Sequence, residues 1–220
     1  MIGTGRKIRE LTMPLQNRVD PFGALCAVPA RGLLFGNRGG RFHRDDGTLS
    51  RRRWTSRAWI CCRLAFKGRH REVWGRGFTE LFFLDEPTAL AAGHRPCFEC
   101  RRADATAFAA AWARAHRLNA APRAGAMDEV LNAQRLDGPG KRRHRVQLDE
   151  LPDGAMIVLE SEAPFAVRGE ALLPWGFAGY GPARPRPRGM TVELLTPPAI
   201  VAVLSAGYRP QWHPSAGEPS

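Results

Sequence analysis

Short runs of apolar side chains bounded by glycine predict β-strands in the first half of the chain. Residues 59–66, 69–74 and 78–84 are rich in β-branched and aromatic side chains, and glycines separate them. This pattern predicts three antiparallel strands joined by turns. Residues 13–50 are rich in glycine and arginine, and the run GNRGG at residues 36–40 is interpreted as a turn between further short strands. A phosphate-binding loop is the alternative there, but the Gly-Lys-Ser/Thr ending of a P-loop is missing.

Helical patterns follow these strands. Asp85 can cap a short helix that has a proline in its first turn and ends at Gly93. Apolar residues at helical spacing predict a second helix over residues 105–117, with Asp104 as its N-cap, and a third over residues 127–136.

The pattern changes after the chain break at residues 137–140 (DGPG). A final helix is predicted from Pro198 to Leu204, and Gly207 stops it. The chain is therefore expected to have an α+β fold, with antiparallel strands, a metal-binding loop and helices first. A small β-barrel-like or β-layer part with a terminal helix follows. Its strands are predicted over residues 155–159, 165–168, 171–175 and 191–195.

The charge of the chain favours a polyanionic partner. There are 33 basic and 21 acidic side chains, which gives a formal net charge of +12. Lysine occurs only at Lys7, Lys67 and Lys141, so nearly all of the basic residues are arginine. The planar guanidinium matches phosphate oxygens, so an arginine-rich surface suits DNA or RNA. A GC-rich genome explains part of the arginine preference, but it explains the net excess of positive charge less easily.

Basic residues also cluster beside aromatic ones such as Trp54, Trp59 and Trp74, a combination that can bind phosphates and stack on unpaired bases. The alternative is a solvated basic surface over buried tryptophans. We predict contact with nucleic acid. The clusters lie at residues 51–53, 67–71, 101–102, 141–145 and 184–188.

Five cysteines and the absence of an export signal argue against a disulfide framework. No apolar run approaches the ~18 residues of a membrane span. We therefore expect a cytoplasmic protein without membrane contact, in which Cys97 and Cys100 form a Cys-x-x-Cys pair for metal or redox chemistry. A redox pair normally opens a helix after a strand, whereas this pair follows a helix stop. The spacing therefore favours half of a zinc site.

Residues 81–101 (LFFLDEPTALAAGHRPCFECR) resemble the end of the Ada-type zinc-binding domain, in which a strand and a short alanine-rich helix precede an Arg-Pro-Cys-x-x-Cys-Arg loop. The chain as a whole also resembles an uncharacterised family of bacterial proteins. The resemblance implies zinc as cofactor. In full Ada domains two further cysteines complete the site, and one of them accepts a methyl group from a DNA phosphotriester. This sequence lacks the Cys-x-x-x-Cys that would match them.

The remaining zinc ligands must come from upstream. Cys61 and Cys62 are adjacent on a predicted strand, so they point to opposite faces and only one can bind the ion. Cys62 is favoured as the third ligand and Cys61 as a core residue. His43 ranks first as the fourth ligand, because it resembles the histidine of His/Cys variants of the domain. Other candidates for the fourth position are His70, His94 and Cys26.

The expected site is a structural zinc staple in a nucleic-acid-binding protein. The sequence contains no Gly-x-Ser-x-Gly, His-Glu-x-x-His or P-loop motif, so an enzyme is not favoured. One alternative is an Ada-like repair protein that accepts methyl groups on the zinc-bound Cys62. Another is a zinc-stapled protein-interaction module.

The length of the chain allows one large domain or two small ones. The first twelve residues lack apolar periodicity, so Met13 is an alternative start to Met1. The segments expected are a loose leader at residues 1–12, a zinc-bearing α+β domain at 13–140, a small β-rich domain with a C-terminal helix at 141–208, and a loose tail at 209–220.

Overall fold

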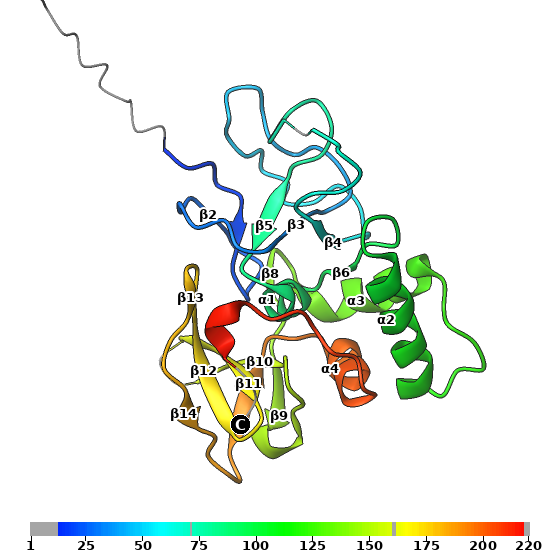
Figure 1. Ribbon diagram of the computed structural model, residues 1–220, viewed down its shortest axis with the longest axis vertical. Helices are drawn as coiled ribbons and strands as arrows, with labels where there is room; N and C mark the ends of the chain where they lie inside the picture. Colours follow the sequence, from blue (N-terminus) through cyan, green and yellow to red (C-terminus); the bar gives the residue numbers. More distant parts are fainter. Residues whose placement is uncertain (1–12, 71, 160–161, 218–220) are drawn as a thin grey trace, which may run out of the picture.

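The described chain contains both strands and helices (Figure 1), which confirms the α+β prediction. The computed structural model describes residues 13–70, 72–159 and 162–217. The predicted leader at residues 1–12 and the last three residues, 218–220, lie outside this part. Within it, no helix combines the length and the apolar character needed to cross a bilayer.

The first sheet is mixed and contains the first half of the chain. Its strands are β1 (Arg18–Val19), β2 (Leu25–Cys26), β3 (Leu34–Asn37), β4 (Ile60–Arg63), β5 (Leu81–Phe83) and β6 (Arg95–Pro96), in the spatial order β2-β1-β5-β3-β4-β6. β3 is antiparallel to both β4 and β5, whereas β6 is parallel to β4. This parallel pairing brings the residues that follow β6 to the side of β4.

The strand prediction for residues 69–74 is wrong, and the predicted three-strand arrangement does not form. Residue 71 lies outside the described residues, and none of the others in this range belongs to a strand. The chain turns here: Trp74 has a φ of 62°, and the N–H of Gly75 donates to the carbonyl of Glu72 at 3.1 Å. β4 and β5 do form, but β3 lies between them.

Gly36, which was interpreted as part of a turn, lies inside β3 and sets the spacing of the sheet. A Cβ at this position would lie 2.1 Å from the carbonyl oxygen of Ile60 and 2.9 Å from a ring carbon of Phe83. Any side chain would therefore push β4 away from β3, so this glycine is required by packing within a strand.

The helices are α1 (Glu86–Ala91), α2 (Arg102–Ala115), α3 (Ala124–Arg135) and α4 (Pro198–Ser205). Asp85 caps α1 as predicted, because its carboxylate accepts the backbone N–H of Thr88 at 3.1 Å. Gly93 follows α1 with a φ of 85°, the left-handed conformation that glycine adopts without strain. Asp104 is not the N-cap of α2. That position belongs to Arg101, whose Nε donates to Asp104 at 2.9 Å.

The second sheet is open, so it matches the β-layer and not the barrel-like alternative. Its spatial order is β13-β12-β11-β10-β15-β9, and β14 also pairs with β12. The strands are β9 (His144–Gln147), β10 (Met156–Val158), β11 (Pro164–Arg168), β12 (Ala171–Gly176), β13 (Gly179–Tyr180), β14 (Arg184–Pro185) and β15 (Thr191–Leu194). A separate hairpin, β7 (Leu136–Asp137) with β8 (Gly140–Lys141), links α3 to this sheet.

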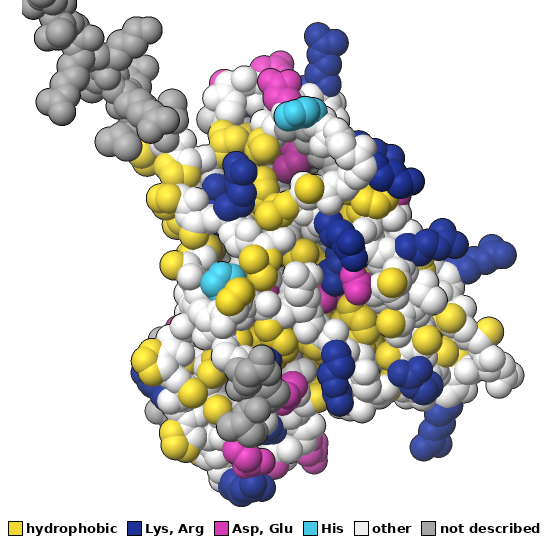
Figure 2. Space-filling model, in the orientation of Figure 1, with side chains coloured by type: hydrophobic (Ala, Val, Ile, Leu, Met, Phe, Trp, Pro, Cys, Tyr) yellow, Lys and Arg dark blue, Asp and Glu magenta, His cyan; other side chains and the backbone are white. Residues whose placement is uncertain are grey.

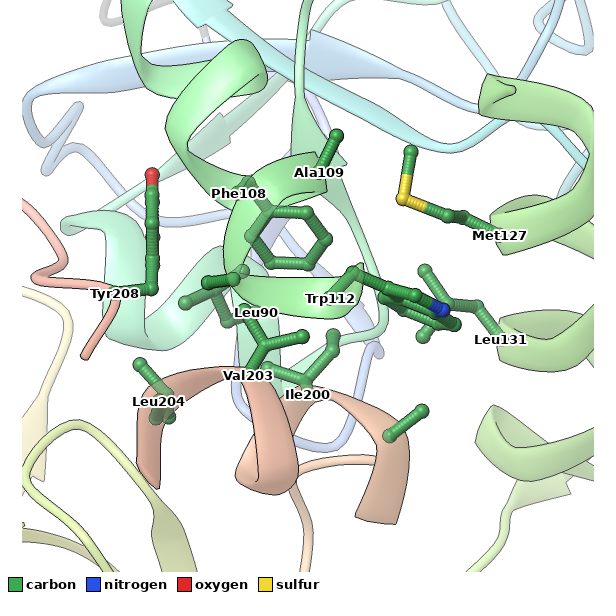
Figure 3. Close-up of a cluster of buried hydrophobic side chains, with 12 residues drawn as sticks. Leu90, Phe108, Ala109, Trp112, Met127, Leu131, Ile200, Val203, Leu204 and Tyr208 are labelled. Carbon is green, nitrogen blue, oxygen red and sulfur yellow. The ribbon is translucent and has the colours of Figure 1, made fainter. Parts of the chain in front are cut away.

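The predicted boundary at residue 140 separates the two sheets but not the hydrophobic core. In Figure 3 the side chains of α4 pack against those of α2 and α3, which come from the other side of the boundary. Each large apolar side chain buried here stabilises the fold by about 1.5–3 kcal/mol. The cluster includes Phe108 and Trp112 of α2, Met127 and Leu131 of α3, and Ile200 and Val203 of α4.

Residues 209–217 do not form a loose tail, because they pack against the start of α1. The N–H of Gln211 donates to Glu86 at 2.8 Å, and the N–H of His213 donates to Asp85 at 3.1 Å. Both carboxylates are buried and need donors, which the tail supplies. The prediction failed because these partners lie far away in the sequence.

Candidate metal centre

Three cysteine sulfurs converge beside the first sheet. The Sγ atoms of Cys62, Cys97 and Cys100 lie within 4.8 Å of one another, and all three residues are buried. Sulfurs that bind one zinc ion at ~2.3 Å in tetrahedral geometry lie about 3.8 Å apart, so small side-chain adjustments suffice to place an ion between them. The three side chains could therefore hold a metal ion.

The parallel pairing of β4 with β6 creates this arrangement. Cys62 lies on β4, and Cys97 comes directly after β6. The N–H of Cys97 donates to the carbonyl of Cys61 at 3.0 Å, which places the start of the Cys-x-x-Cys loop beside β4. Cys100 then precedes α2, and the N–H of Arg101 donates back to the carbonyl of Cys97 at 3.0 Å, which closes the loop.

Strand alternation separates Cys61 from Cys62, as the sequence argument requires. Cys61 faces the opposite side of β4, where it is fully buried and its sulfur accepts a hydrogen bond from Arg101 at 3.2 Å. Burial raises the pKa of the Cys61 thiol to about 12. Cys61 therefore has the surroundings of a core thiol, and Cys62 is the one that meets the Cys-x-x-Cys pair.

Two buried ion pairs hold the loop in place. Arg95 binds both carboxylate oxygens of Asp128 on α3, at 2.8 and 2.7 Å. Arg101 donates to Glu86 on α1 at 2.7 Å. These pairs attach the segments before and after the cysteine pair to two different helices, so the thiols are presented by a rigid loop.

The three thiols share protons unequally. Hydrogen bonds from Cys100 and Cys62 hold the pKa of Cys97 below its ordinary value, helped by the backbone amides of Cys100 and Glu99. The hydrogen bonds that Cys62 makes to the other two thiols raise the pKa of Cys62. Cys97 is therefore the first of these cysteines to lose its proton. This matters for metal binding because the thiolate, and not the thiol, is the metal ligand.

The histidine proposed as fourth ligand lies elsewhere. His43 does not belong to the metal-ligating group found among the described residues. Its Nδ1 is 2.8 Å from the hydroxyl of Thr79, its Nε2 is 3.1 Å from the carbonyl of Gly75, and its ring stacks on Trp74 at 5.1 Å. The prediction was wrong because a buried histidine satisfied by neighbouring polar groups has the same sequence signature as a ligand.

The other three candidates also lie outside the group. His94 is fully buried between aromatic rings, 5.0 Å from that of Trp59, and its Nε2 accepts from Arg38. His70 is exposed in the loop after β4, and Cys26 is half-buried on β2. Within the described chain, three side chains are thus placed so that they could hold a metal ion, one fewer than the four ligands that structural zinc sites use.

A pocket of about 390 Å³ opens beside the three sulfurs. All three cysteines line it, together with the polar side chains of Asn37, Ser56, Arg69, Glu80 and Glu99. Arg69 and Glu99 form an ion pair of 2.6 Å, and both are substantially exposed. A metal ion bound by the cysteines would therefore lie beside a space that solvent or a ligand can enter, unlike a closed four-ligand staple.

Comparisons of this chain with protein-family models, curated proteins and solved structures find no match. The functional argument therefore depends on the chemistry and geometry of the residues themselves.

Proposed function

We propose that this protein binds one zinc ion through Cys62, Cys97 and Cys100, and that the ion braces a surface that contacts nucleic acid. The observation that carries the proposal is the convergence of three buried sulfurs within 4.8 Å. Clustered thiolates favour zinc among the common cellular divalent ions, because soft sulfur ligands select against magnesium and calcium.

The fourth zinc ligand comes from the pocket and not from His43. Water is the simplest occupant, since the pocket beside the sulfurs can admit solvent and has polar groups such as Asn37 and Ser56 in its otherwise partly apolar lining. Three thiolates and Zn²⁺ together carry one negative charge. The sequence similarity of residues 81–101 to the Ada-type domain also supports zinc as the metal.

The zinc proposal is tested by metal content. We expect one zinc per chain in the wild-type protein and in Cys26→Ser, the matched control, because Cys26 lies outside the cluster. Cys62→Ser, Cys97→Ser and Cys100→Ser should each lose the ion, as measured by elemental analysis of protein purified in parallel. Equal zinc in the wild-type and triple-serine proteins would refute the proposal.

The surface of the protein supports contact with a polyanion. Figure 2 shows Lys and Arg side chains spread over one face, several of them on the side where α2 and α3 lie, with fewer acidic side chains between them. The formal net charge is +12. Such a surface attracts phosphates and releases their counterions, so binding should weaken steeply as salt is raised.

The nucleic-acid proposal is tested by fluorescence anisotropy with labelled DNA and RNA over a range of salt concentrations. A straight decline of log affinity with log salt is expected. Absence of binding to every oligonucleotide at low salt would contradict the proposal and favour a zinc-stapled protein-interaction module.

A second candidate function is methyl transfer to Cys62. It is favoured by the pocket that Cys62 lines, because a methyl acceptor must be reachable. In that reaction the Cys62 thiolate would attack the methyl carbon of a DNA phosphotriester; the S–C bond forms, the C–O bond breaks, and a phosphodiester leaves. Mass spectrometry should then find a methyl group on Cys62 after incubation with methylphosphotriester DNA. Its absence in zinc-loaded protein would exclude this candidate.

A further inference from the structure

A second pocket, distinct from the cysteine cluster, is lined by buried cations. Its volume is about 500 Å³, within the range of roughly 300–1,000 Å³ that small-molecule sites occupy. Arg38 and Arg135 line it and are only 2% and 1% exposed, and Lys141 of β8 completes the group. Charged side chains are almost never buried this completely unless they are paired.

These three cations have no carboxylate partner. Among the described residues, no carboxylate oxygen lies within the 4.0 Å of an ion pair from their nitrogens, although ten such pairs occur elsewhere in the structure. Arg38 donates to the carbonyl of Gly23 at 2.8 Å, Arg135 donates to that of Gly93 at 3.1 Å, and Lys141 donates to that of Ala91.

The surroundings offset only part of this charge. Both guanidinium groups lie over the ring of Trp59, with the Cζ of Arg38 4.0 Å and the Cζ of Arg135 3.9 Å from a ring centre. The α1 C-terminus, to which Lys141 bonds, supplies at most about half a negative charge. Asp20 adds up to one more through space, although burial raises its pKa. The positive charge of Arg38, Arg135 and Lys141, whose pKa burial lowers to about 7, therefore exceeds the negative charge that surrounds it.

The pocket also holds unused hydrogen-bonding capacity. The Nε of Arg135 is buried and has no hydrogen-bond partner. Burial lowers the pKa of both guanidinium groups to about 9, so both stay charged at neutral pH. An unpaired donor on a buried cation is costly, and an anion in the adjacent pocket would offset part of that cost by attracting the guanidinium charge.

The rim adds a further cation and an aromatic face. Arg53 and Trp54 line this pocket, and both are partly exposed. They also line a neighbouring pocket of about 450 Å³, together with Arg51 and Arg52, so the basic surface continues outward from the buried cations. The ring of Trp54 lies 5.8 Å from that of Trp59, which places an aromatic platform beside the buried guanidinium groups.

We propose that this pocket binds the phosphate of a nucleotide unit, with the base stacked on Trp54. The compact buried charge suits a phosphate, because guanidinium groups bind its oxygens in a fork and phosphate can carry more than one negative charge. The aromatic rim suits the flat face of a base. This inference deepens the nucleic-acid part of the proposed function and does not depend on zinc.

The test measures the affinity of the full-length protein for inorganic phosphate, adenosine, AMP and a 5′-phosphorylated oligonucleotide, by titration calorimetry and thermal shift. AMP at about a hundred times its Kd should raise the Tm by roughly 5–10 °C. AMP should bind more tightly than phosphate, and Trp54→Ala should remove that advantage. Adenosine, which lacks the phosphate, should bind weakly.

The variants Lys141→Met and Arg53→Gln should weaken phosphate and AMP about tenfold or more, since each removes a charged donor. Both side chains are partly exposed, so these variants keep the test decisive if substitution of the buried Arg38 or Arg135 prevents folding. Arg188→Gln is the control, because Arg188 is exposed and lies outside the pocket. It should leave the affinities for phosphate and AMP unchanged.

The outcomes separate this inference from the proposed function. Oligonucleotide binding that is unchanged in Lys141→Met, Arg53→Gln and Trp54→Ala would overturn the pocket assignment while leaving nucleic-acid contact intact. Binding of AMP without any oligonucleotide binding would support the pocket and overturn the nucleic-acid proposal. Absence of a Tm shift with phosphate, AMP and the oligonucleotide would overturn the inference outright.

Discussion

Substitution of Asp128 by Asn should destabilise the protein strongly, because it leaves a buried arginine without its counter-charge. Arg95 and Asp128 are 6% and 7% exposed at their side chains and are joined by two short hydrogen bonds. At 2.7 Å and an effective dielectric constant of about 20, their attraction is about 6 kcal/mol. Desolvation offsets part of it, and removal of one partner from a buried pair costs about 3–5 kcal/mol.

Urea denaturation and thermal melting measure this effect. For a chain of this size the loss corresponds to a Tm lower by roughly 6–20 °C. Glu170→Gln is the control: it breaks the Arg188–Glu170 pair, whose side chains are 76% and 75% exposed, and should cost less than about 1 kcal/mol. The double variant Arg95→Met, Asp128→Leu should be more stable than Asp128→Asn. A change within about 0.5 kcal/mol for Asp128→Asn would refute the reasoning.

Three further predictions concern the metal, the pH and the sheet. A zinc chelator should lower the Tm of the wild-type protein but not that of Cys62→Ser, which has already lost the ion. Sulfate is a suitable probe of the pH dependence of the cation-lined pocket, because its own charge does not change between pH 6 and 8. The affinity of the protein for sulfate should fall as pH rises through the pKa of Lys141, which burial lowers to about 7. In Lys141→Met the affinity should not change with pH, because Arg38 and Arg135 remain charged. Gly36→Ala should lower the free energy of unfolding by about 1–3 kcal/mol or more and weaken zinc binding, because a Cβ at this position would press on β4. Gly125→Ala is the control: a Cβ there meets nothing within 4 Å, so this variant should be neutral or stabilising in urea denaturation.

The position of two of the cysteines relative to each other followed from strand geometry alone. Neighbouring residues on a strand face opposite sides, so only one of Cys61 and Cys62 could join Cys97 and Cys100. In the structure Cys62 lies beside Cys97 and Cys100, and Cys61 is buried in the core on the other face of the strand. Likewise the cap at Asp85 follows from local backbone chemistry, which depends on a few consecutive residues.

The fourth ligand could not be found in the same way. A histidine that binds metal and one that bonds to a hydroxyl and a carbonyl look alike in the sequence, and only the folded chain shows that His43 has the second role. The buried cations were also missed. Residue 38 lies far along the chain from residues 135 and 141, and no local pattern indicates that the three share one pocket.

By itself, the sequence determined the features that depend on neighbouring residues: the mixed α+β class, the positions of the helices and of several strands, the faces on which cysteines lie, and the excess of positive charge. Tertiary structure alone decided that β3 separates β4 from β5, that one core joins both halves, and that three cations without carboxylate partners meet in a pocket. The physical reason is that backbone dihedrals and side-chain periodicity are local, whereas burial, pairing and charge compensation depend on which distant segments the fold brings together.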